Sequence, residues 1–190
     1  MSKVNDIFNE LSALQKHIIL LLYARDCEPI PGVAWFQKEL YLVAENVPEV
    51  SKEAGFVSGA YGPCSKNADD RLKDLVLRGM VNKKGNKISL SDLGVKVAHK
   101  VVKEASKDTL ELLDDFKGLL NDMSGKELTT FIYLTFPESD ASLAPKGIKE
   151  DRVVVAKTLY RKGKLSLERA AEIAGVSVED FRQTMMANVQ

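Results

Sequence analysis

Apolar residues recur at spacings of three and four through the first eighty residues, the period of a helix with one buried face. Ser12 and Gln15 form a capping box, which predicts a helix start. Pro29 and Pro31 interrupt the chain after this helix, and Pro48 is expected to end a second one. Ser65 then predicts the start of a third helix. The apolar stripes are Leu14, Ile18, Leu21 and Leu22; Phe36, Leu40 and Val43; and Ala68, Leu72, Leu75 and Val76.

The helical period stops at Gly79, and two short extended runs follow around Gly85 and Asn86. This pattern predicts a β-hairpin over 80–90. Ser91 then starts a fourth helix, which carries Val97 and Val101. Helices, a tight hairpin and a closing helix are the order of a winged helix, with the third helix as recognition helix. The alternative is another small α+β domain with a lone hairpin.

The second half of the chain is expected to be entirely helical. Residues 107–135 read as two helices, the second of them started by a capping box of Ser124 and Glu127. The fold class is therefore mainly α with a small β-hairpin. We expect a winged-helix domain over 1–106, a helical extension over 107–137, a linker over 138–150 and a helix-turn-helix over 151–190.

The helix-turn-helix rests on small residues placed where two helices must cross closely. We expect a helix from Arg152 to Arg161, whose residues Val154, Val155, Leu159 and Tyr160 are available for burial. A short helix is expected over Leu167–Ala174. Ser177 then starts the last helix, on which Met185 faces inward. Ala171 is small, and Gly175 permits a turn with positive φ. An ordinary helical hairpin with alanine packing is the alternative. The expected hydrophobic centre is Ala170, Ala174, Val176 and Phe181.

Charge and composition limit the partners. The chain has 27 basic and 27 acidic residues, so contact with nucleic acid requires a local basic patch. Its longest apolar run, 17–24, is too short to cross a membrane, and no signal peptide precedes it, so we expect no membrane partner and a cytoplasmic location. Cys27 and Cys64 form no CxxC pair, which gives no ligand spacing for zinc.

Candidate DNA-binding side chains occur in three places. Lysines at the hairpin tip are suited to phosphate contacts, while Asn67 and Gln183 can read adenine and Arg182 guanine. Basic residues at 152, 157, 161, 162 and 164 could hold the DNA backbone, although acidic residues nearly balance them. The full candidate set is Lys66, Asn67, Lys73, Lys83, Lys84, Lys87, Ser177, Glu179, Arg182 and Gln183.

Catalytic chemistry leaves no trace in the sequence. His17 and His99 have no carboxylate, serine or cysteine partner at a telling spacing. No glycine-rich phosphate loop, GxSxG elbow or HExxH motif is present. We therefore expect no catalytic residue, no metal site, no cofactor and no enzymatic activity.

Two stretches resemble known prokaryotic families. Residues 10–138 resemble winged-helix proteins related to Panacea-type antitoxins, on the motif Tyr61-Gly62-Pro63, the later residues Leu72, Leu75 and Gly79, and the segment Phe136-Pro137-Glu138. The C-terminal stretch is similar to small antitoxin-like helix-turn-helix proteins. That similarity rests on 156–160, 163–166, Ala170-Ala171, 174–177 and Phe181. The C-terminal resemblance implies toxin neutralisation, operator binding, or both.

Two functions therefore compete. The first is a non-enzymatic transcriptional regulator that binds double-stranded DNA as a homodimer, with the helices of 107–135 as the interface. The alternative is a protein-interaction module that neutralises a toxin protein without binding DNA. The zero net charge and the acidic residues on both candidate recognition helices favour this alternative.

Overall fold

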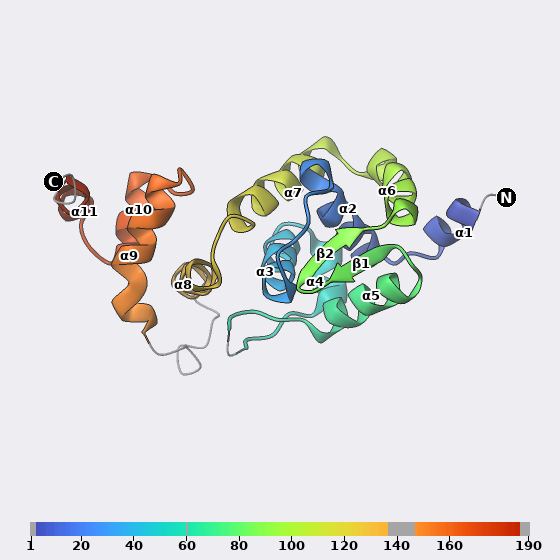
Figure 1. Ribbon diagram of the computed structural model, residues 1–190, viewed down its shortest axis with the longest axis horizontal. Coiled ribbons are helices and arrows are strands. Elements are labelled where there is room, and N and C mark those ends of the chain that lie inside the picture. The colour runs from blue at the N-terminus through green and yellow to red at the C-terminus, as the bar shows by residue number, and fades with distance from the viewer. Residues whose placement is uncertain (1–2, 60, 137–146, 187–190) are drawn as a thin grey trace. The chain divides into compact units, whose positions relative to one another are not determined.

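The computed structural model describes residues 3–59, 61–136 and 147–186. These residues form mainly helices, together with one two-stranded antiparallel sheet (Figure 1). The chain forms two compact units, and each is described by itself. The first contains 1–57 and 63–122, and the second contains 58–62 and 123–190.

In the first unit, α2 is the central helix, because α4, α5, α6, α7 and β2 all pack against it. The buried stripe expected on α2 is confirmed, since Leu14, Ile18, Leu21 and Leu22 are all enclosed. The elements are α1 (Lys3–Asn9), α2 (Ala13–Cys27), α3 (Val33–Ala44), α4 (Pro48–Ala54), α5 (Lys66–Leu77), β1 (Val81–Lys84), β2 (Lys87–Leu90), α6 (Asp92–Glu104) and α7 (Lys107–Leu120).

The predicted helix starts are confirmed at the level of single hydrogen bonds. The Ser12 side chain accepts from the backbone N–H of Gln15, and the Gln15 side chain accepts from the N–H of Ser12. The hydroxyls of Ser65 and Ser91 cap α5 and α6 by accepting from the N–H groups of Ala68 and Gly94, without a reciprocal bond. Side-chain oxygens thus satisfy N–H groups that the first turn of a helix leaves unpaired.

The hairpin also forms as predicted, with Val81 opposite Leu90 and Lys84 opposite Lys87. Gly85 adopts a φ of 60° in the two-residue turn, a value that glycine reaches without strain. Ile88 is buried and also forms an isolated bridge to Ile30, which anchors the hairpin to the core.

Two helices of the first unit were not predicted, and one boundary was wrong. Pro48 does not end the second helix, because α3 already stops at Ala44. Pro48 instead stands at the start of α4, where a missing N–H costs nothing. The polar segment before Ser12 also contains α1, whose few apolar residues pack against the core beside α6.

The second unit contains α8 (Gly125–Thr135), α9 (Ile148–Arg161), α10 (Leu167–Ala174) and α11 (Val178–Met186). Its grouping differs from the expected helical extension over 107–137. α7 packs on α2 and α3 of the first unit, whereas α8 packs on α9. The expected linker covers 138–150, of which residues 138–146 lie outside the described residues. The last residues of that range belong to α9, which begins at Ile148.

The hydrophobic centre beneath α11 is confirmed for three of its four predicted residues: Ala170, Ala174 and Phe181 are buried. Val176 is 37% exposed, because it lies in the turn after Gly175 rather than on a helix face. Val154 was also expected to be available for burial and is 61% exposed. Its neighbour Val155 takes the inward position, about 100° further around α9.

Candidate nucleic-acid interface

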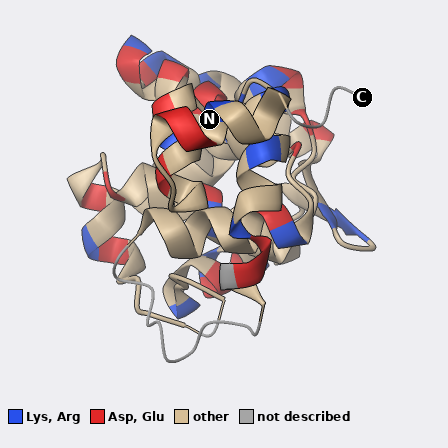
Figure 2. Ribbon diagram, turned by 90° about the vertical axis from the view of Figure 1, so that its left-hand side faces the viewer, with Lys and Arg blue, Asp and Glu red and all other residues tan. Residues whose placement is uncertain are grey.

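The hairpin presents three exposed lysines, Lys83, Lys84 and Lys87, around its turn. Strand pairing fixes them near one another, since Lys84 and Lys87 are direct cross-strand partners. Within the part of the chain that the structure describes, no carboxylate lies at ion-pair distance from any of them. Figure 2 shows blue at this hairpin near its turn, while blue and red are interspersed along the helices. These like charges are therefore available to an external anion.

The candidate side chains of α5 already have partners within the protein. Lys66 and Lys73 both bind Asp70 on the same helix face. The hydrogen bond between Lys66 and Asp70 raises the pKa of the lysine and lowers the pKa of the carboxyl group. Asn67 donates its side-chain N–H to the carbonyl of Glu53 at 3.0 Å. With Arg71, Asp69 and Asp74 also counted, α5 carries as many acidic as basic side chains.

On α11, the exposed side chains of Arg182 and Gln183 are accessible to an external partner. Arg182 lies 3.6 Å from Glu179, a loose contact between two solvent-exposed groups. Ser177 has a structural task, since its hydroxyl caps α11 by accepting from the N–H of Asp180 and donating to the Asp180 carboxylate. The candidate residues therefore divide between the two units, with the hairpin and α5 in one and α11 in the other.

Arg152 fixes the turn between α10 and α11. Its guanidinium donates to the carbonyls of Ile173 and Glu172 at 2.8 and 3.2 Å, at the end of α10. The turn residue Gly175 has a φ of 73°, and a Cβ there would collide with this guanidinium. Arg152 was expected among the residues that hold the DNA backbone. The structure gives it internal partners, because carbonyls at a helix end attract a cation.

Lys162 is likewise engaged inside the second unit, although the sequence placed it among the possible DNA-backbone contacts. Its ammonium group lies 2.8 Å from a carboxylate oxygen of Glu127. Glu127 is desolvated by burial, which opposes ionisation, but its bonds to Lys162 and Ser124 prevail and lower its pKa. Lys126 pairs with Asp151 in a second bond between α8 and α9. These bonds leave fewer free cations around the predicted helix-turn-helix.

Lys117 is a buried cation that the sequence reading missed. Its side chain is 0% exposed, and its ammonium donates to the carbonyls of Leu21, Leu22 and Ala24 at 3.0, 3.2 and 3.0 Å. Burial lowers the pKa of Lys117 to about 8. A signal was present, because Lys117 continues the apolar stripe of α7 from Leu113 and an exposed lysine would break it.

Glu39 is a buried acid whose charge interacts with that of Lys117. Its two carboxylate oxygens have no hydrogen-bond partner among the described residues. Burial raises the pKa of Glu39 well above its usual value, while the positive charge of Lys117 partly offsets the rise. The interior of the first unit therefore holds a pair of ionisable groups beneath the end of α2.

The end of α2 has an unusual backbone. Arg25, Asp26 and Cys27 have φ values of 52°, 53° and 62°. These values lie in the left-handed region of backbone conformation, which residues other than glycine avoid. The Asp114 carboxylate accepts from the N–H of Arg25 at 2.8 Å. Together with Lys117 it holds this turn on both sides, because it binds an N–H while Lys117 binds the carbonyls.

Among the described ranges, no group of three or more His, Cys, Asp or Glu side chains is arranged to hold a metal ion. The histidines have separate surroundings: His17 Nδ1 lies 2.8 Å from the Ala13 carbonyl oxygen, and His99 stacks edge-on with Tyr23. In the same described ranges, no helix has both the length and the apolar character needed to cross a membrane.

The fold and these sites describe a mainly helical protein with one basic hairpin. Comparison with known proteins adds a family match: residues 149–188, which run from the second residue of α9 past the end of α11, are similar to a family of unknown function (DUF7317). No curated protein and no solved structure matches the chain.

Proposed function

We propose that this protein is a non-enzymatic, cytoplasmic transcriptional regulator of the antitoxin-like type that binds double-stranded DNA. In this proposal the first unit is a winged helix related to Panacea-type antitoxins, and α9, α10 and α11 contain a helix-turn-helix. The observation that carries it is the cluster of Lys83, Lys84 and Lys87 at the hairpin, exposed and without acidic partners in the described ranges.

Among the residues described, the hairpin lysines are unpaired and those of α5 are paired, and this difference indicates which of them contact phosphate. Like charges held together on a short hairpin repel one another, and a phosphate backbone relieves that repulsion. Lys66 and Lys73 would have to leave Asp70 before either could bind phosphate. The hairpin therefore supplies affinity without reading sequence, and base reading is assigned to Arg182 and Gln183 on α11.

Salt dependence gives this proposal a magnitude. Each phosphate contact contributes about 0.9 to the slope of log affinity against log salt, so loss of three contacts lowers the slope by up to about 2.7. Between 50 and 200 mM salt, the wild type should then lose about 40-fold more affinity than a variant without the hairpin lysines.

The test is a fluorescence titration of genomic DNA fragments with the wild type and with the variant Lys83→Gln/Lys84→Gln/Lys87→Gln. The matched control replaces the exposed lysines at 96, 103 and 107 by Gln, which removes the same charge from α6 and α7. Only the hairpin variant should show weaker binding and a shallower salt slope. Equal slopes for both variants, or no binding by the wild type at low salt, would refute the proposal.

A second candidate function, the protein-interaction module that neutralises a toxin, is favoured by a groove of about 410 Å³ beside α5. Val33, Leu72, Val76 and Leu77 supply its apolar lining, and Leu77 is 86% exposed. A partner would cover this surface with an apolar helix face. The test is the affinity of the purified neighbouring-gene product for wild-type protein and for Leu77→Asp, with Lys96→Asp as control. If Leu77→Asp binds as tightly as the control, this candidate fails.

The homodimer is a separate part of the proposal. Leu113 and Leu120 of α7 and Phe131 of α8 are already buried in the single chain, so they are not free to form the expected interface. Half-buried Leu112, Phe116 and Leu119 remain on α7. Light scattering of the full chain should give twice the monomer mass, and a mass of one chain at assay concentration would reject the dimer.

A further inference from the structure

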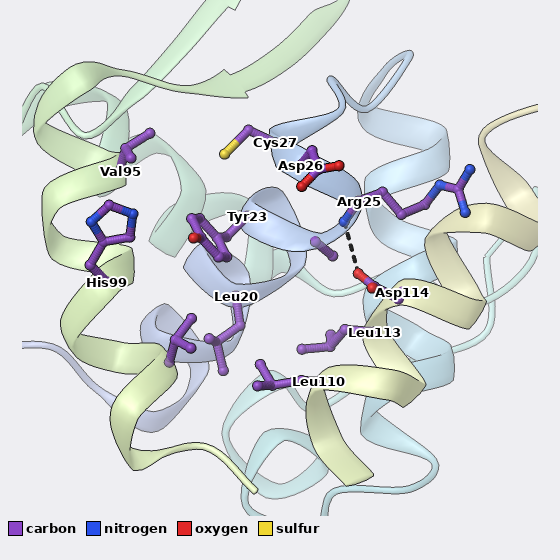
Figure 3. A pocket seen from close by; sticks show the side chains of 12 residues that line it. Leu20, Tyr23, Arg25, Asp26, Cys27, Val95, His99, Leu110, Leu113 and Asp114 are labelled. Atoms are coloured by element: carbon purple, nitrogen blue, oxygen red, sulfur yellow. Dashed lines mark hydrogen bonds between the residues drawn. The ribbon is translucent and has the colours of Figure 1, made fainter. Parts of the chain in front are cut away.

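A pocket of about 440 Å³ lies in the first unit, among α2, α6 and α7 (Figure 3). Small-molecule pockets in proteins have volumes of about 300–1,000 Å³. Leu20, Leu110 and Leu113 form its apolar floor, and polar residues line its upper rim. The pocket is therefore large enough for a small organic molecule with an apolar body.

The rim is built on the left-handed turn of Arg25, Asp26 and Cys27. Consecutive residues of this kind are costly, and such backbone strain is concentrated at ligand clamps and other functional sites. Here the turn brings Asp26 to the mouth of the pocket (Figure 3).

Two acids, Asp26 and Asp114, stand at the mouth of the pocket. Asp26 is exposed and has no ion-pair partner among the described residues, and Asp114 lies on the same side of the pocket with its carboxylate on the N–H of Arg25. The Arg25 guanidinium turns away from the pocket and binds Glu28 at 2.8 Å (Figure 3). A cation entering the pocket therefore meets both carboxylates, while the guanidinium of Arg25 is held on Glu28.

Aromatic rings form a third side of the pocket. Tyr23 and His99 meet edge to face, with ring centroids 5.6 Å apart. The face of a tyrosine ring attracts a cation as well as an apolar group. The aromatic side of the pocket therefore adjoins both the acidic rim and the apolar floor.

We propose that this pocket binds a small organic cation, an amine that carries an apolar group. The ammonium group lies at the mouth between Asp26 and Asp114, and the apolar body enters toward Leu20 and Leu110. The proposal does not depend on DNA binding, because hairpin, α5 and α11 residues take no part in it.

The test uses three probes of similar size and different charge: 2-phenylethylamine, 2-phenylethanol and 3-phenylpropionate. Amide chemical shifts of the full chain would report binding, with the amine expected at a roughly millimolar dissociation constant. The amine should bind about fivefold or more tightly than the alcohol, and the acid should bind weakest.

Two variants locate the site. Asp26→Asn removes the charge but keeps a residue type that tolerates positive φ, so it should weaken amine binding about threefold or more and leave alcohol binding unchanged. Val95→Phe should weaken binding of all three probes by filling the pocket. Asp115→Asn, an exposed acid of α7 outside the lining, is the control. Equal affinity for amine and alcohol, preference for the acid, no binding, or an unaffected Asp26→Asn would overturn the proposal.

Discussion

Replacement of Lys117 by Met should destabilise the first unit, because it leaves the carbonyls of Leu21, Leu22 and Ala24 without their donor. A buried acceptor without a partner costs about 1–3 kcal/mol, so the gross loss is about 3–9 kcal/mol. The variant also escapes the cost of burying a charge. The pKa of Lys117 falls from 10.5 to about 8, which corresponds to about 3 kcal/mol. We therefore expect the free energy of unfolding to fall by about 3 kcal/mol.

Urea unfolding followed by far-UV circular dichroism would measure this change at pH 7. Lys107→Met is the matched control, because Lys107 lies on the same helix but is 86% exposed in its ion pair with Glu111. The control should change the free energy of unfolding by less than about 0.5 kcal/mol. If Lys117→Met is as stable as the control, or more stable than the wild type, the reasoning about this buried donor is refuted.

The pH dependence of this difference has a definite sign. The folded state releases the Lys117 proton near pH 8, whereas the unfolded chain keeps it to about pH 10.5. Between these values the unfolded state binds more protons, so wild-type stability rises with pH. The advantage of the wild type over Lys117→Met should therefore grow between pH 8 and 10.5, by up to about 3 kcal/mol. A difference that stays constant across this range would contradict the burial of a charged amine.

Two further predictions concern the second unit. Gly175→Ala should destabilise it more than Gly163→Ala in thermal unfolding: both positions have positive φ, but an added Cβ collides with Arg152 only at Gly175. Gly163→Ala should cost about 1 kcal/mol, and equal costs would show that the collision is relieved freely. Phe181→Ala should lower the free energy of unfolding by about 3–5 kcal/mol, while exposed Met186→Ala changes it by less than about 0.5 kcal/mol. If Phe181→Ala and Met186→Ala unfold at similar midpoints, Phe181 does not contribute to the core as described.

The sequence by itself determined the helix starts and the hairpin. Ser12, Ser65 and Ser124 cap helices through bonds to residues three positions away, and Gly85 allows a two-residue turn. These features depend on neighbours in the chain, so the residue types suffice to predict them. The exposed hairpin lysines also belong to this group, because strand pairing alone places them together.

Only the tertiary structure decided which charges are free. The charge balance of α5 was within reach of the sequence, since Asp70 lies on the same helix as Lys66 and Lys73, but their pairing needed side-chain geometry. The burial of Lys117 and the pocket beside Asp26 depend on α7 meeting the end of α2, about ninety residues earlier in the chain. The apolar stripe of α7 indicates that Lys117 faces inward, but long-range packing selects its partners from the many contacts that the sequence permits.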